Sequence, residues 1–192
     1  MRALLVAMDE WLRGGAAPPP SRYPRLQDKT LVRAADVAFP SLPGVRAPQT
    51  LPVGLRAPNL AIPHAGSPGT PLPYLVPQTD HDGLELAGVR LPEIEVPLAT
   101  YTGWNYRNPS IGGADQLYPL LGSYIPFAAT AAARAAANDP RAAVGERYAS
   151  KQAFVDKVRA AADKLVVERY LLAEDLPGVV ERAQKHWDLL TH

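Results

Sequence analysis

The stretch from Ser150 to Leu190, SKQAFVDKVRAAADKLVVERYLLAEDLPGVVERAQKHWDLL, predicts two amphipathic helices. Ser150 can cap a first helix that runs to about Glu168, and Asp175 can cap a second one, with Pro177 in its first turn, where a missing N–H is tolerated. The apolar positions, which recur at spacings of three and four, are Phe154, Val158, Ala161, Ala162 and Leu165 in the first helix and Leu176, Val179, Val180, Ala183, Trp187 and Leu190 in the second. Residues 169–174 would join them as an antiparallel pair.

The region before this pair carries strand signals and then weaker helix signals. Asp82-Gly83 is a hairpin turn signal, flanked by Leu75-Val76 and by the segment Leu84–Leu91. Ile94, Val96 and Leu98 alternate with Glu95 and Pro97, which predicts a strand with one buried face, while Pro92 and Pro97 restrict such strands to edges or irregular pieces. Further along, we expect a short helix over 114–121 and an alanine-rich helix over 127–138.

The N-terminal part predicts a helix followed by an extended chain. Leu4, Leu5, Met8, Trp11 and Leu12 follow helical spacing within residues 1–15, and Gly14-Gly15 is a natural stop. No capping residue precedes this helix, so we expect it to continue from an upstream segment. Between Pro18 and Pro77 the chain holds 14 of its 21 prolines. Residues 16–72 therefore predict a proline-rich wrap, ordered and extended over 20–45 and mobile over 46–72.

Together these patterns predict an α+β fold in a single region, 1–192, which we do not expect to be a complete domain. It consists of a helix (1–15), the proline-rich wrap (16–72), a β-hairpin and loop (73–113) and a helical part (114–192) that ends in the helical pair. The net charge of +1 argues against a nucleic-acid partner. The absence of cysteine excludes disulfides, thiol catalysis and zinc–thiolate sites.

Membrane and targeting signals are weak. No apolar run reaches the roughly 18 residues that a membrane span needs. The opening apolar run is interrupted early by Asp9 and Glu10, so it predicts a helix rather than a signal peptide. The sequence does not indicate the cellular compartment, and none of its motifs predicts a cofactor.

Two acidic clusters are candidate sites. Asp80-His81-Asp82-Gly83 could supply metal ligands, but Asp and Gly also serve the backbone of turns, and we expect a turn and no metal. Glu93 and Glu95 could act as an acid–base pair, yet that requires facing surfaces with different environments. We expect them to lie on a solvated strand face.

No nucleophile and base can be assigned from the pattern. Ser67 in HAGSPG and Ser110 in NPSIGG do not fit the G-x-S-x-G elbow. The chain has four dispersed histidines, His64, His81, His186 and His192. We place His186 on the flank of its helix. We therefore expect no catalytic residue in this chain.

The loop TGWNYR is the best candidate for a binding site. Trp104 and Tyr106 could form a flat apolar wall, with Asn105 and Arg107 as polar contacts to a substrate. The alternative is that Trp104 belongs to the core and Arg107 pairs with an acidic residue. We expect Trp104 to be at least half buried under either interpretation.

Four long phrases carry a family resemblance. They are ALLVAMDEWLRGGAAPPPSRYPRLQDKTLV, DGLELAGVRLPEIEVPLATYTGWNYR, LLGSYIPFAATAAARAAANDPRAAVGERYAS and LVVERYLLAEDLPGVVERAQKHW. In this order they resemble the C-terminal part of a bacterial family of large α/β-hydrolase-domain proteins. The resemblance covers nearly the whole chain except residues 46–70.

The resemblance implies that the hydrolase sheet and its nucleophilic serine lie upstream, with the triad histidine just before the first helix of this chain. None of those residues can be transferred to a position here. We therefore expect the C-terminal portion of an esterase-type hydrolase, whose partner is the upstream hydrolase domain or a second copy of itself. The alternative is a stand-alone structural or interaction module without catalysis.

Overall fold

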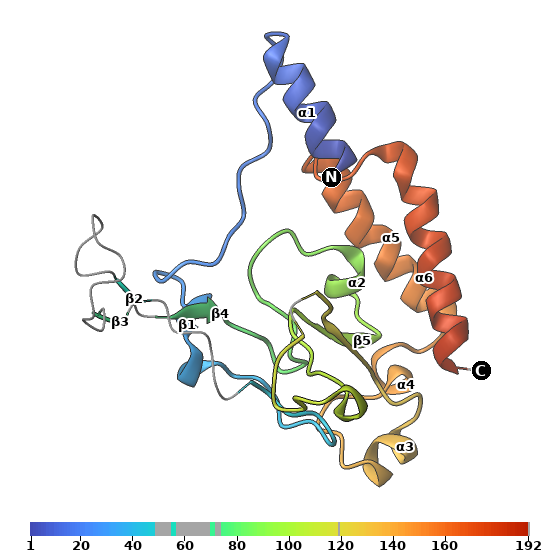
Figure 1. Cartoon of the computed structure of the whole chain (residues 1–192). Coiled ribbons are helices and arrows are strands. Elements are labelled where there is room, and N and C mark those ends of the chain that lie inside the picture. The colour runs from blue at the N-terminus through green and yellow to red at the C-terminus, as the bar shows by residue number, and fades with distance from the viewer. Residues whose placement is uncertain (49–54, 57–69, 72–73, 119, 192) are drawn as a thin grey trace.

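The computed structural model describes residues 1–48, 55–56, 70–71, 74–118 and 120–191 of the chain (Figure 1). Its helices are α1 (Arg2–Leu12), α2 (Pro92–Glu95), α3 (Ala131–Ala136), α4 (Val144–Arg147), α5 (Lys151–Val167) and α6 (Leu176–Thr191). Its strands are β1 (Leu31–Arg33), β2 (Leu55–Arg56), β3 (Thr70–Pro71), β4 (Leu75–Pro77), β5 (Ala99–Thr102) and β6 (Ser123–Pro126). The strands pair antiparallel in twos, β1 with β4, β2 with β3 and β5 with β6, so the fold is α+β.

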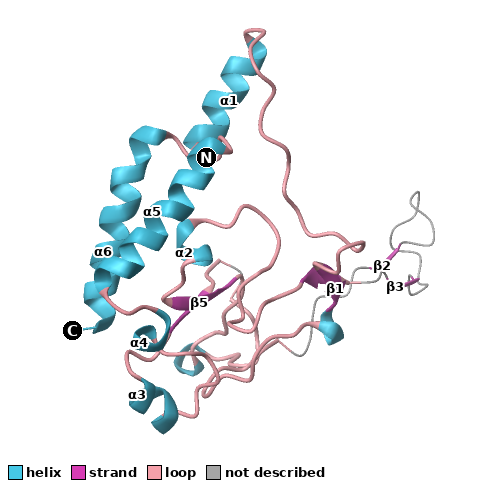
Figure 2. Cartoon of the chain, turned by 180° about the vertical axis from the view of Figure 1, so that it is seen from behind, coloured by secondary structure: helices cyan, strands magenta, loops and turns pink. Residues whose placement is uncertain are grey.

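The predicted helical pair is present as α5 and α6, which lie side by side (Figures 1 and 2). The Ser150 hydroxyl accepts a hydrogen bond from the Ala153 N–H at 3.1 Å, so the predicted cap forms. Arg169 adopts φ +65° where α5 ends, and a short 3-10 turn, Ala173–Asp175, leads into α6. The Asp175 carboxylate binds the guanidinium of Arg2, which ties the start of α1 to this turn.

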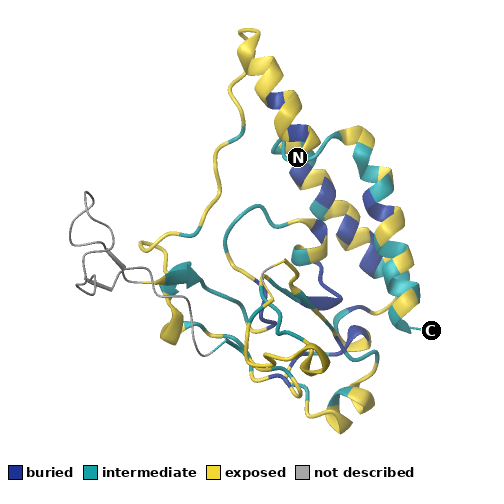
Figure 3. Cartoon of the chain, in the orientation of Figure 1, coloured by how far each residue is buried: buried dark blue, intermediate teal, exposed yellow. Residues whose placement is uncertain are grey.

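The hydrophobic core lies where this pair meets α2, the segment before β5 and the chain around α4. Its buried members are Val96, Leu98, Phe127, Val144, Tyr148, Phe154, Val155, Val158, Ala162, Val179 and Val180. Figure 3 shows buried positions gathered on the facing sides of these elements, whereas α1 and the chain after it are mostly exposed. The apolar stripes predicted for α5 and α6 therefore supply much of the core.

The segment around Ile94 differs from the expected strand. It forms the short helix α2, because Pro92 can occupy the first helical turn and Pro97 has no N–H to offer a ladder. The strand starts later, at Ala99, and β5 pairs with β6, which the sequence did not predict. The side chains of Glu93 and Glu95 thus project from a helical turn and do not share a strand face.

The Asp82-Gly83 turn forms, but the flanking segments do not pair along their length. The Asp80 carboxylate accepts from the N–H groups of Asp82 and Leu84, each at 3.0 Å. Only one antiparallel bridge follows, between Thr79 and Glu85. β4 pairs with β1 from the proline-rich part instead, so the hairpin is reduced to a tight turn.

The two helices expected before α5 also differ. Residues 114–118 form a turn, because Leu117 bridges to Tyr106 and the segment closes back onto that loop. In the alanine-rich region, β6 occupies 123–126, and α3 is confined to Ala131–Ala136, capped by the Thr130 hydroxyl. Asn138 at φ +54° ends it.

The proline-rich part is extended where it is described. Residues 14–30 contain no long helix or strand, and β1 and a 3-10 turn, Ala34–Asp36, follow. The mobility expected for 46–72 falls mostly outside the described residues. Over the described part of the chain, no helix is both long and apolar enough to cross a membrane.

Candidate functional site

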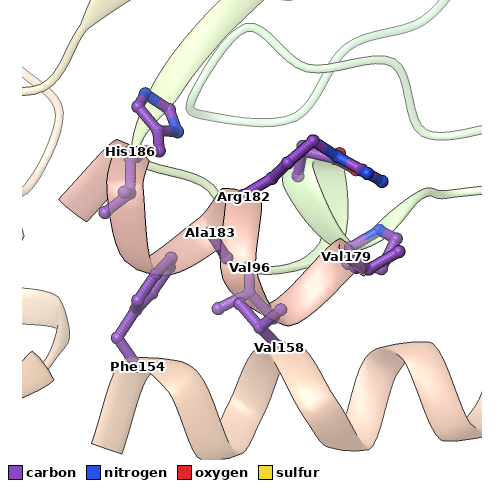
Figure 4. Close-up of a pocket in the computed structure, with 10 residues that line it drawn as sticks. Val96, Phe154, Val158, Val179, Arg182, Ala183 and His186 are labelled. Atoms are coloured by element: carbon purple, nitrogen blue, oxygen red, sulfur yellow. The ribbon is translucent and has the colours of Figure 1, made fainter. Parts of the chain in front are cut away.

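A pocket of about 150 Å³ opens between α2, the start of β5, α5 and α6 (Figure 4). Its walls are apolar, and they consist of Val96, Leu98, Phe154, Val158, Val179 and Ala183. Its mouth carries Pro92 and Glu93 from α2 together with Arg182 and His186 from α6. The arrangement of an apolar interior with a few polar groups at the entrance is the common form of a small-molecule site.

His186 at the mouth is held by a tyrosine from the neighbouring sheet. Its Nε2 lies 2.6 Å from the hydroxyl of Tyr124 on β6, and the Tyr124 ring is 5.6 Å from that of Tyr101 on β5. Burial lowers the pKa of His186 from its ordinary 6.5, and the Glu93 carboxylate partly opposes this. The imidazole is therefore neutral at pH 7.

The two tyrosines remain protonated. Burial raises the pKa of Tyr124. Burial also raises the pKa of Tyr101 to about 12, with smaller contributions from Tyr124 and Glu93. The Tyr124 hydroxyl and Nε2 of His186 share one hydrogen bond, in which the donor depends on the tautomer of the imidazole. This bond fixes the orientation of the imidazole at the edge of the pocket.

The predicted TGWNYR loop packs against the proline-rich part. Trp104 is half-buried, as expected, and its ring meets the edge of Phe39 at 5.5 Å. Arg46 lies over the ring of Tyr106 at 3.9 Å, and the Asn105 side chain accepts from the N–H of Tyr106 at 2.8 Å. These contacts hold the loop in one shape and cover part of its aromatic surface.

Arg107 has a different environment from its three neighbours. Its side chain is half-buried, and among the described residues its Nε has no hydrogen-bond partner. Its backbone N–H donates to the carbonyl of Gln116. The acidic partner considered from the sequence is not among its contacts in the described part of the chain.

The loop and the pocket lie on different sides of the β5–β6 pair. The hydroxyl of Ser123 donates to the Trp104 carbonyl at 2.8 Å, while the next residue, Tyr124, binds His186. Because successive side chains of a strand point to opposite faces, β6 contacts the loop with one face and the pocket with the other. The structure therefore separates the four predicted binding residues from the pocket.

The Asp80–Gly83 cluster serves the fold. The carboxylate of Asp82, 3 % exposed, forms a two-pronged ion pair with Arg147, whose Nη1 lies 2.7 Å from Oδ2. Within the described ranges, no group of three or more His, Asp or Glu side chains is arranged to hold a metal. Asp82 is thus a buried anion whose carboxylate is paired with Arg147.

The remaining candidate residues also lie apart from one another. Glu95 pairs with Arg90 at 2.9 Å, whereas Glu93 stands at the pocket mouth. Ser110 lies in a 3-10 turn, Pro109–Ile111, and not at a strand-to-helix turn. Ser67, His64 and His192 lie outside the described residues.

Comparison with known proteins gives the family. The sequence profile described as "Alpha/beta hydrolase domain" matches residues 1–181, so the chain belongs to this family. No curated protein and no solved structure matches the chain.

Sequence reasoning missed the pocket and its His186–Tyr124 pair. The helical period of α6 puts His186 four residues after Arg182 and three after Ala183, so these three positions share a face. This signal was available in the sequence. The strand β6, 62 residues before His186, left no comparable signal.

Proposed function

We propose that this chain is the C-terminal portion of an esterase-type α/β-hydrolase and that the catalytic nucleophile lies outside it. Membership of the hydrolase family supports the class of protein. The observation that carries the proposal is the exposed apolar surface of α1. Only Ala3 and Ala7 of this helix are buried, while Leu4, Leu5, Val6, Met8, Trp11 and Leu12 are exposed.

Such a surface is unusual for a helix in contact with water on most sides. Large contiguous apolar patches mark surfaces that another protein body covers. Polar contacts fix α1 only along one side, through Arg2 to Asp175 and Glu10 to Arg169 at 2.7 Å. The upstream hydrolase domain is the occupant that the family suggests, and a second copy of this chain is the other candidate.

In the complete hydrolase, we place the TGWNYR loop at the rim of the active-site cleft. Asn105, Tyr106 and Arg107 would contact the substrate, with Trp104 as the anchor. Support comes from Arg107, whose Nε has no hydrogen-bond partner within the described part of the chain. Exposed apolar side chains nearby, Ile111, Leu120 and Leu121, give this region a second surface suited to a covering domain.

The substrate-binding role is tested on an enzyme that contains both parts. Arg107→Ala should raise KM for an ester with a carboxylate group, because the guanidinium would no longer meet that acceptor. The melting temperature should change little. A large loss of melting temperature with unchanged kinetics would make Arg107 structural and the loop a packing element.

A second function, a stand-alone interaction module, is favoured by one observation. The chain has its own core, built by α5 and α6 on α2 and the segment before β5. The reading frame upstream of Met1 separates the two proposals. An in-frame G-x-S-x-G motif supports the hydrolase portion, and an in-frame stop codon with a promoter directly before Met1 supports the module.

A further inference from the structure

The pocket between α2, α5 and α6 has the size of a small aromatic ring. An apolar cavity of about 150 Å³ is large enough to hold a benzene molecule, and this pocket has that volume. Phe154, Val158 and Val179 in its walls are buried residues of the main core. The walls therefore belong to the packed core, and a ligand would enter a preformed site.

Arg182 and His186 both line the mouth. They are four residues apart on α6 and therefore share a side of that helix, and their side chains extend from it in different directions (Figure 4). Arg182 contributes an exposed, permanently charged guanidinium. His186 uses Nε2 for Tyr124. A negatively charged acceptor would satisfy the guanidinium, and the imidazole would donate to it in the tautomer that carries its proton on Nδ1.

One acidic group faces these donors. Glu93 on α2 lines the same mouth, but its side chain is exposed. Its repulsion of an anion is therefore screened by water and salt. The two donors outnumber this single acceptor, and a planar carboxylate matches the guanidinium in a way that an ammonium group cannot.

We propose that this pocket binds a small aromatic carboxylate of the size of benzoate, with the ring between Val158 and Ala183 and the carboxylate beside Arg182 and His186. The site lies within this chain and needs no upstream nucleophile. The proposal therefore stands or falls separately from the proposed hydrolase role.

The first test compares three probes of equal size in ¹H–¹⁵N NMR titrations of the 192-residue chain. Benzoate should bind more tightly than benzyl alcohol, and benzylamine most weakly, with shifts centred on the amides of 154–158 and 182–187. Absence of shifts at these amides with benzoate would overturn the proposal. Benzylamine binding as tightly as benzoate would overturn the carboxylate assignment.

The second test fills the pocket. Ala183→Leu adds three carbons to its wall and should weaken benzoate binding at least about tenfold, because the ring volume is occupied. Ala160→Leu places the same change on the exposed side of α5 and should leave binding unchanged. Equal binding by both variants would locate the ligand elsewhere.

The third test changes the mouth charges. Arg182→Gln should weaken benzoate about tenfold and leave benzyl alcohol unaffected, since only the anion uses the guanidinium. Arg159→Gln removes a charge from an exposed position on α5 as a control. Glu93→Gln should tighten benzoate binding, and a weaker affinity in that variant would contradict the assigned role of Arg182 and His186.

Discussion

At the scale of single residues, the fold depends on two arginines, of which Arg141 is buried and Arg147 is partly buried. Arg147 pairs with Asp82, and Arg141, 3 % exposed, binds the Asp139 carboxylate at 2.6 Å and the Thr100 hydroxyl at 2.8 Å. Both guanidiniums also face the ring of Phe127, at 4.1 and 4.9 Å. These contacts join the Asp82 turn, the β5–β6 pair and α4 into one unit.

Removing one partner of the Asp82–Arg147 ion pair should strongly destabilise the fold. Arg147→Met leaves Asp82 buried without its counter-charge and should lower the free energy of unfolding by about 3–5 kcal/mol. The exposed pair Arg13–Asp9 gives the control. Arg13→Met should change the free energy of unfolding by less than about 1 kcal/mol. Urea unfolding measures both values, and equal effects would show that the Asp82 pair is not desolvated.

His186 should make stability depend on pH. Burial lowers its pKa in the folded state, so the unfolded state binds more protons between pH 6.5 and that lower value. The free energy of unfolding should therefore fall as pH drops below 6.5. His186→Gln should lose this component, whereas exposed His81→Gln should retain it. Urea midpoints at about pH 7.5 and pH 5 measure the difference, and an identical pH dependence in both variants would refute it.

At the scale of elements, the Asp82-Gly83 turn shows what a glycine does here. Gly83 has φ +78°, and an added Cβ would lie 2.8 Å from the Phe39 ring. Gly88 has φ +93°, with open space around its Cα. Gly83→Ala should thus lower the free energy of unfolding by about 2–4 kcal/mol, through backbone strain and a steric clash. Gly88→Ala should lower it by about 1 kcal/mol, through backbone strain alone. Thermal unfolding of the two variants compares them, and equal losses would mean that Phe39 moves aside freely.

The helix α1 should drive association of the chain. Its exposed apolar residues are expected to make the protein self-associate at high concentration. Leu5→Glu should shift the population toward monomer, while Leu189→Glu, which alters an even more exposed position on α6, should not. Sedimentation velocity provides the measurement. A wild-type protein that stays monomeric at all concentrations would argue against an unsatisfied interface on α1.

The elements that the sequence predicted well are those with local signals. The Ser150 cap and the spacing from Phe154 to Leu165 lie within one helix, so the period alone identifies them. β6 was missed because its partner lies in β5, and pairing of distant segments leaves little trace in a short strand. The expected strand at Ile94 became α2, since Pro92 favours a first helical turn.

At the scale of the whole molecule, the site was the part least visible in the sequence. The loop from Trp104 to Arg107 was identified by its composition, and its contacts with Phe39 and Arg46 depend on how the proline-rich part folds back. The pocket requires three elements to meet, and the hydrogen bond between His186 and Tyr124 joins α6 to β6, which are far apart in the sequence. A single sequence carries residue types and spacings but no such long-range contacts.

The architecture also frames the proposed role. The core of α5 and α6 supports the pocket, the β5–β6 pair separates that pocket from the TGWNYR loop, and α1 exposes an apolar surface. The family assignment over residues 1–181 gives the class of protein. The central claim is that this part shapes and supports a hydrolase without supplying its nucleophile.

A fluorophosphonate probe tests that claim most directly, because it labels a serine only when a base activates it. The purified 192-residue chain is incubated with the probe, and its intact mass is measured beside a turnover assay with p-nitrophenyl acetate. The account predicts an unchanged mass and no turnover above background. A stoichiometric adduct on Ser67 or Ser110, with turnover lost on substitution of that serine by alanine, would contradict it.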